Sequence, residues 1–180
     1  MRKLILKMEA SVDGYVGRPD ADDPSWLMPY YDEELTAYAV DLLSSAGVHA
    51  MGRNTYEHMA PHWQVSDEPF AAPMNAIPKA VFSSTLERAT WPETTIYRGD
   101  LAVEIARLKE LDGGPILAHG GARFAQSLVR CGLVDEFRLH MHPTALGEGV
   151  QMFGAEARLE LLWSRTFARG TVALAYAPAG

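Results

Sequence analysis

The chain has 180 residues, of which 48% are hydrophobic and 22% are charged, and its formal net charge is −7. This length suits one substantial core rather than two domains, and the composition is that of a globular protein without a disordered block. The negative charge argues against a general nucleic-acid binder, which needs a basic stripe, but it leaves room for a local basic pocket that binds an anionic ligand.

Residue content also excludes several kinds of structure. Cys131 is the only cysteine, so one chain has neither a disulfide framework nor a cysteine metal cluster. The N-terminal segment MRKLILKMEA has only a very short apolar run, which predicts a strand and not a signal peptide. No stretch approaches the roughly 20 apolar residues of a membrane helix, so we expect a cytoplasmic protein that binds neither membrane nor nucleic acid.

The first part of the chain alternates between predicted strands and helices. Residues 3–9 form a strand, and a loop rich in Asp, Gly and Pro follows it. A helix then begins at Asp32, with apolar residues at helical spacing: Leu35, Tyr38, Ala39, Leu42 and Leu43. Residues 48–51 form the second strand. The short helix after it is expected to end at Pro61, and residues 61–78 are expected to be an irregular surface connection.

The rest of the chain continues this alternation and closes with strands alone. The expected elements are strands at 79–84 and 94–98, a helix at 100–111, a strand and glycine turn at 114–121, a helix at 122–132, and strands at 134–143, 158–167 and 171–177. Their order predicts a single α/β domain over residues 1–180. It has one mostly parallel central sheet, flanking helices and a C-terminal antiparallel hairpin.

Three predicted strand ends carry residues that suit a phosphate. They are Gly52, Arg53 and Thr55 after residues 48–51, Ser83 and Ser84 in VFSS, and Gly120, Gly121 and Arg123 in HGGAR. Glycine lets the backbone approach an anion, N–H groups at a helix start point toward it, and open α/β sheets bind ligands at the carboxyl ends of their strands. Each end can also be a plain turn, but a ligand shared by all three is the interpretation that we favour.

These segments resemble, in order along the chain, the motifs of dihydrofolate reductases. MGRNTYE is similar to their MGRxTWE-type segment, SVDGYVG to their first strand and loop, HGGARF to their glycine-rich turn, and KAVFSS to their strand that ends in paired serines. SVDGYVG and RLHMHPTALGEGVQMF resemble even more closely the reductase domain of the riboflavin-pathway bifunctional deaminase-reductase, which shares that fold. The resemblance extends from residue 11 to residue 153.

The resemblance implies a dihydrofolate reductase-like fold, a homodimer, and NADPH as the cofactor. The pyrophosphate and the adenosine phosphate are then expected near Gly52, Arg53 and Thr55, and the adenosine-ribose phosphate at Ser83 and Ser84. The pyrophosphate is also expected to be surrounded by Gly120, Gly121, Ala122 and Arg123. The nicotinamide is expected near Val16. Ala122 stands where many reductases have a third glycine.

Hydride transfer to a C=N or C=O bond also needs a proton source. In dihydrofolate reductases a carboxylate on the first helix supplies or relays the proton, a few residues after a tryptophan. Asp32 stands six residues after Trp26, so the resemblance implies that Asp32 is catalytic. Asp32 also suits the N-cap of its helix, and both interpretations stay open here.

The histidines predict no metal site. His58 and His62 are four residues apart, but Pro61 interrupts the helix that is needed to align them, and the sequence contains no HExxH motif. His119 precedes Gly120, where either a place in the cofactor pocket or a packing role is consistent with the pattern.

The sequence therefore predicts an NADPH-dependent reductase that transfers a hydride to a small heterocyclic substrate, either pterin-like or pyrimidine-like. Dihydrofolate is one candidate, and a ribosylamino-pyrimidine is another, although the chain carries no deaminase domain with zinc ligands. The alternative is a dinucleotide-binding module with little catalysis that serves sensing or interaction. Turnover of NADPH against a panel of substrates separates these two functions.

Overall fold

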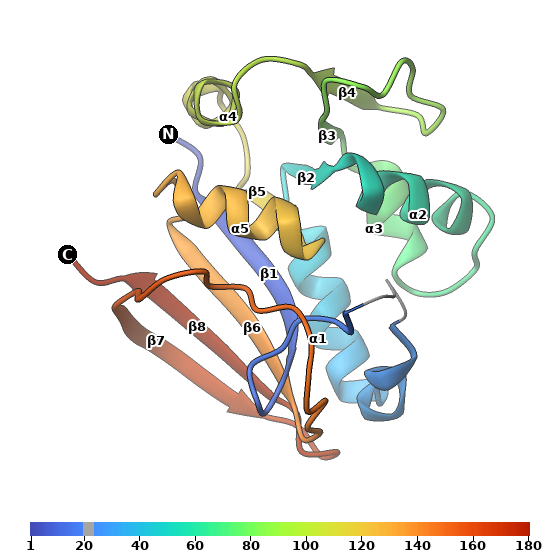
Figure 1. Ribbon diagram of the computed structural model, residues 1–180. Coiled ribbons are helices and arrows are strands. Elements are labelled where there is room, and N and C mark those ends of the chain that lie inside the picture. Colours follow the sequence, from blue (N-terminus) through green and yellow to red (C-terminus); the bar gives the residue numbers. More distant parts are fainter. Residues whose placement is uncertain (20–23) are drawn as a thin grey trace.

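An eight-stranded sheet, in the order β4-β3-β2-β5-β1-β6-β8-β7, organises the computed structural model, which describes residues 1–19 and 24–180 (Figure 1). The strands are β1 (Leu4–Ser11), β2 (Val48–Gly52), β3 (Lys79–Phe82), β4 (Thr94–Tyr97), β5 (Ile116–His119), β6 (Glu136–His142), β7 (Leu159–Thr166) and β8 (Val172–Pro178). Neighbours from β4 to β6 are parallel, whereas β8 is antiparallel to both β6 and β7. The predicted mostly parallel sheet with a C-terminal antiparallel hairpin is confirmed.

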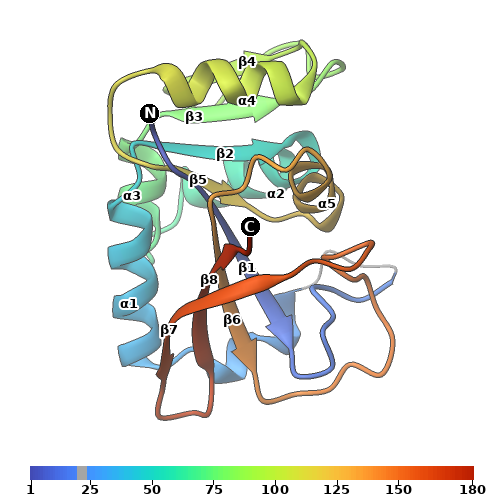
Figure 2. The same ribbon diagram turned by 90° about the vertical axis from the view of Figure 1, so that its left-hand side faces the viewer.

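Helices cover both faces of the sheet (Figures 1 and 2). On one face lie α1 (Glu33–Ser44), α2 (Arg53–Trp63) and α3 (Ala71–Ala76), and on the other lie α4 (Leu101–Glu110) and α5 (Ala122–Arg130). Two short 3-10 helices, η1 (Pro24–Trp26) and η2 (Met28–Tyr30), precede α1. None of the helices in the described part of the chain has the length and apolar character needed to cross a membrane.

The alternation of β1 assigns its side chains to the two faces. Leu4, Leu6 and Met8 join the core beneath α4 and α5, whereas Ile5 packs with residues of α1 on the opposite face. Because successive side chains of a strand point to opposite faces, Lys7 and Glu9 share the face of Ile5. Two charged groups in the middle of the sheet are therefore directed toward the α1 side.

Two expectations for the segment between β2 and β3 are wrong. The helix α2 does not end at Pro61 but continues to Trp63 with Pro61 inside it. A proline removes its own N–H donor and crowds the carbonyl four residues earlier, but so close to the end of a helix few further hydrogen bonds remain to be disrupted. Residues 71–76 form α3 rather than an irregular connection, because Ala71 and Met74 are buried in the core. Six residues are too few for helical periodicity to show in the sequence.

Candidate functional site

A smaller cavity of about 380 Å³ lies where β2, β3 and β4 end. Its lining includes four of the residues predicted to bind the cofactor, namely Gly52, Ser83, Ser84 and Arg123, together with Arg98. The ring of Phe82 stacks against Tyr97 and Phe124, with centroid distances of 5.2 and 5.6 Å. Hydroxyl and guanidinium groups beside stacked aromatic rings suit a ligand that combines a phosphate with a flat base.

A larger cavity of about 810 Å³ lies on the α1 side of the sheet, near the carboxyl end of β5. Four other residues predicted at the cofactor line it: Val16, Thr55, Gly120 and Gly121. The predicted set is thus divided between the two cavities. Of its remaining members, Arg53 donates a hydrogen bond of 3.0 Å to the Thr85 hydroxyl, and Ala122 is the first residue of α5.

The starts of α2 and α5 are adjacent, and both differ from the starts of the other long helices. Asp32 and Asp100 accept backbone N–H groups at the beginnings of α1 and α4. The N-caps of α2 and α5 are Gly52 and Gly121, and neither helix has a side-chain cap. The first-turn N–H groups of α2 and α5 are therefore available to an anion.

Close packing accounts for glycine at both of these N-caps. A Cβ placed on Gly121 would lie 2.9 Å from the Thr55 hydroxyl, and one on Gly52 would lie 3.3 Å from Cβ of Phe124. The backbone of Gly121 is extended, with φ of −99°, so space rather than a special dihedral angle requires glycine there.

Asp32 is the N-cap of α1, as one of the two sequence interpretations predicted. Its Oδ1 accepts the backbone N–H of Leu35 at 2.9 Å. Its Oδ2 is buried and has no hydrogen-bond partner among the described residues. The neighbouring Tyr31, and not the cap itself, is among the residues that line the larger cavity. The proton-relay role of Asp32 stays a prediction.

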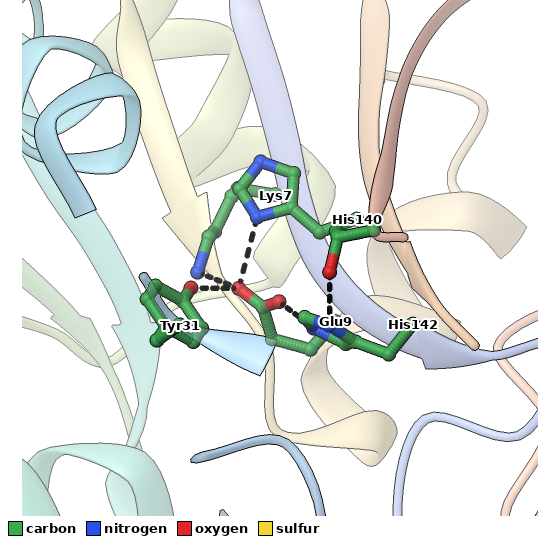
Figure 3. Close-up of polar contacts among 6 residues, drawn as sticks. Lys7, Glu9, Tyr31, His140 and His142 are labelled. Atoms are coloured by element: carbon green, nitrogen blue, oxygen red, sulfur yellow. Dashed lines mark hydrogen bonds and ion pairs between the residues drawn. The ribbon is translucent and has the colours of Figure 1, made fainter. Parts of the chain in front are cut away.

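Glu9 is the centre of a polar cluster (Figure 3). Three members of the cluster, Lys7, Glu9 and Tyr31, line the larger cavity and form what we call its floor. The carboxylate of Glu9 forms an ion pair with Lys7 and accepts a hydrogen bond of 2.9 Å from the Tyr31 hydroxyl. His140 Nδ1 lies 3.2 Å from Oε1, and His142 Nε2 lies 2.7 Å from Oε2. Since an ionised carboxylate only accepts, both imidazoles donate to it.

Opposing effects set the ionisation of this cluster. Burial alone raises the pKa of Glu9, but the charges of Lys7 and His140 and the hydrogen bonds from His140 and His142 outweigh burial and hold the pKa well below 4.5. Burial, followed by the charge and hydrogen bond of Glu9, raises the pKa of Tyr31 well above 10. At neutral pH, Glu9 is therefore a carboxylate and Tyr31 a neutral phenol.

His119 both packs in the core and lines the larger cavity, so the two roles considered for it are compatible. It is 4% exposed, and its Nε2 lies 2.9 Å from Nδ1 of His49. Burial lowers the pKa of His49 to about 4, and burial, His49 and Lys7 lower that of His119 well below 6.5. Both rings are therefore neutral at pH 7. Within residues 1–19 and 24–180, no three His, Cys, Asp or Glu side chains are arranged to hold a metal ion.

The sequence interpretation missed Lys7, Glu9 and Tyr31. A signal for the first two was present, because charged residues two positions apart interrupt the apolar strand LILKMEA. Such a pattern places both charges on one buried face. No comparable signal marks Tyr31, whose position depends on the course of the loop before α1.

Comparisons with known proteins agree with this architecture. The uncharacterized protein YyaP of Bacillus subtilis is 26% identical over 183 residues, which cover 97% of this chain and 94% of YyaP. A putative riboflavin biosynthesis protein from Shewanella sp. PV-4 superposes with a TM-score of 0.80 at 22% identity, over 99% of each chain. The diaminohydroxyphosphoribosylaminopyrimidine deaminase/5-amino-6-(5-phosphoribosylamino)uracil reductase of Thermotoga maritima superposes with a TM-score of 0.70 at 15% identity, over 99% of this chain and 57% of the other.

The structural likenesses, at these low identities, establish the shared fold. The match to a family model reaches further, because the RibD C-terminal domain model aligns with residues 2–173 and so includes both glycine helix starts and the floor of the larger cavity. The motif order that suggested a riboflavin-pathway reductase domain is thereby confirmed, and the chain belongs to the RibD C-terminal domain family.

Proposed function

We propose that the protein is an NADPH-dependent reductase that transfers a hydride to a small heterocyclic substrate. One observation carries the proposal: the helices α2 and α5 begin at glycine N-caps without side-chain caps, and Gly52 lines the smaller cavity whereas Gly121 lines the larger one. Membership of the RibD C-terminal domain family and the reductase activity named for the Thermotoga maritima protein support the same function.

The residues of the two cavities fit the parts of NADPH. Ser83, Ser84 and Arg123 in the smaller cavity offer hydrogen bonds to the phosphate on the adenosine ribose. The backbone N–H groups after Gly52 and Gly121 would hold the pyrophosphate, since helix starts attract anions. Val16 in the larger cavity would lie by the nicotinamide, and NADPH supplies the hydride when bound.

Two residues of this chain are proposed as the proton source. Asp32 is the proposal that follows from the family resemblance, although its Oδ1 is engaged at the start of α1. Lys7 is a second candidate because it lines the larger cavity. Its ammonium group forms an ion pair with the carboxylate of Glu9 and has three N–H donors, so donors remain for a substrate.

Titration with NADPH and NADH tests the cofactor assignment. We expect NADPH to bind at least about 10-fold more tightly, because charged hydrogen bonds to the extra phosphate are strong. Arg123→Gln should reduce this preference, whereas Arg130→Gln at the other end of α5 should leave it unchanged. Equal affinity of the wild-type protein for both cofactors would remove the proposed phosphate site.

Oxidation of NADPH, followed by absorbance with pterin and pyrimidine substrates, tests the activity itself. Turnover of at least one such heterocycle is the expected result. Tight binding of NADPH without oxidation by any of these compounds would favour the alternative of a dinucleotide-binding module.

A further inference from the structure

Aromatic side chains form a wall of the larger cavity. Trp26, Tyr31, Trp63 and Phe70 all line it, and all four are half-buried. Phe70 packs edge-on against both Trp63 and Tyr31, with ring centroids 6.0 and 5.9 Å apart. Because each ring is packed on one side and lines the cavity on another, the wall offers a large apolar surface to a flat ligand.

The described arginine side chains that line one of the two cavities belong to the smaller cavity and not to the one with the aromatic wall. Arg98 and Arg123 line the smaller cavity. Among the described residues that line the larger cavity there is no arginine, and the single lysine, Lys7, is paired with Glu9. Phosphates are bound in proteins chiefly by arginine forks, lysines and helix starts. The uncapped starts of α2 and α5, from which Thr55 and Gly121 line the larger cavity, are the groups proposed to hold the pyrophosphate of the cofactor, so few groups remain in the larger cavity for a second phosphate.

The other ionisable groups of the larger cavity do not change this balance. His62 Nε2 lies 3.3 Å from the Glu68 carboxylate, and both residues line the cavity. His58 also lines it, and its Nδ1 lies 3.3 Å from the backbone carbonyl of Asn54. The sequence of residues 20–23, which lie outside the described part, is Asp-Ala-Asp-Asp and contains no basic residue.

The floor of the larger cavity is polar but carries no net charge from its ion pair. The charges of Lys7 and Glu9 offset each other. The hydroxyl of Tyr31 donates a hydrogen bond to Glu9, so the Tyr31 oxygen is still able to accept a hydrogen bond from a ligand. A donor at Lys7 beside an acceptor at Tyr31 matches the edge of a heterocycle that has a carbonyl or ring nitrogen next to an N–H group.

From these features we infer that the substrate is an uncharged, planar heterocycle without a phosphate group. Its ring is held against the aromatic wall, and its polar edge lies on Lys7 and Tyr31. The inference rests on the proposed reductase function in treating this ligand as the substrate. It differs from the phosphoribosyl compound in the name of the Thermotoga maritima protein.

Calorimetric titration with matched pairs of probes tests the inference in the presence of saturating NADP⁺. One pair is 5-amino-6-ribitylaminouracil and its 5′-phosphate, and the other is neopterin and its triphosphate. We expect the phosphate-free member of at least one pair to bind 10-fold or more tightly than its partner, with an affinity that is unchanged between low and moderate salt. Tighter binding of the phosphorylated members, or no binding of any of the four probes, would overturn the inference.

Variants locate the binding within the larger cavity. Trp63→Ala should weaken binding of the phosphate-free probe by about 2- to 10-fold, the range expected for one aromatic pair. Trp163→Ala is the matched control, because Trp163 lies on β7 and packs against Tyr38 of α1 instead. Met28, 55% exposed at the rim, allows the reverse test. Met28→Arg should raise affinity for the phosphorylated probe, and an unchanged affinity would show that phosphate binding is not limited by cations there.

NADPH oxidation measured on the same probes separates the two proposals. If the phosphate-free probes bind and none is reduced, the proposed reductase function fails while the ligand class stands. If only the phosphorylated probes are reduced, the reductase function stands and the inferred substrate class is wrong.

Discussion

Glu9 connects parts of the site that are distant in sequence. Its carboxylate reaches Lys7 on the same strand, Tyr31 before α1, and His140 and His142 on β6. Nδ1 of His142 in turn lies 3.0 Å from the hydroxyl of Thr171, the residue just before β8. One side chain thus fixes the cavity floor relative to the C-terminal hairpin.

Replacing Glu9 should lower stability in a pH-dependent way. The folded pKa of Glu9 lies below its unfolded value, so its carboxylate contributes stability above about pH 4.5 and loses that contribution as pH falls toward the folded pKa. Glu9→Gln should therefore lower the free energy of unfolding by on the order of 3 kcal/mol at pH 7, because the partly buried ammonium group of Lys7 loses its partner. The difference from wild type should shrink below pH 4.5.

Urea denaturation at pH 7 and pH 4 measures this effect. Glu160→Gln is the control, since Glu160 is exposed on β7 and should change little at either pH. A Glu9→Gln variant with the wild-type midpoint at pH 7 would mean that the cluster does not stabilise the fold.

Stability and turnover measured on variants of Asp32 and Lys7 show which of the two residues is the proton source. Asn caps helices nearly as well as Asp, so Asp32→Asn should keep its stability, whereas Asp32→Ala should lose about 1 kcal/mol. A positioned proton donor typically contributes about 100-fold or more, and we expect that loss in only one of Asp32→Asn and Lys7→Met. The loss should diminish at low pH if bulk protons replace the missing group. Wild-type turnover in both variants would indicate a donor outside this pair.

The pattern of helix starts is the most informative feature at the level of elements. The sequence predicted α1, α2, α4 and α5 because each combines an apolar stripe with a recognisable cap or glycine. It also predicted that Gly52 and Gly121 face a common ligand, because parallel strands end at one edge. The sequence could not predict α3, which depends on burial of Met74, or the continuation of α2 past Pro61.

Gly121→Val should weaken NADPH binding by at least about 10-fold without unfolding the protein. The extended backbone of Gly121 accepts any residue, but its new side chain would meet the Thr55 hydroxyl at the start of α2. Tryptophan fluorescence measures the affinity, and circular dichroism checks the fold. Gly154→Val is the control, because nothing lies within 4 Å of a Cβ there. Normal NADPH affinity in Gly121→Val would mean that the glycine turn serves the fold and does not contact the cofactor.

At the scale of the whole molecule, the sheet ends in an exposed apolar strand. β7 is the last strand of the sheet, and Leu161 and Leu162 on it are 52% and 48% exposed. Terminal strands with apolar side chains favour pairing with another chain. We propose that a second copy of this chain covers β7, in agreement with the homodimer that the family resemblance implied.

Leu162→Lys should convert a dimer to a monomer, because it places a charge where the second copy is expected to pack. Size-exclusion chromatography with light scattering measures the mass. Val65→Lys is the control, since Val65 is 84% exposed in the loop after α2 and distant in sequence from β7. A wild-type protein that is already monomeric would dispose of the proposal.

The position of β1 in the sheet has a consequence for how the chain folds during synthesis. β1 is made before the other strands of the sheet, yet its two neighbours are β5 and β6, with Leu4 opposite Ile116 and Glu9 opposite His140. Until the ribosome has added roughly a hundred further residues, this apolar strand has no partner, and at about 5–20 residues per second that wait lasts about 5 to 20 seconds. Pairings this far apart in sequence are slow to form and leave apolar segments open to aggregation. The centre of the sheet and the floor of the larger cavity therefore assemble together, late, and no N-terminal fragment ending before β5 can contain the site.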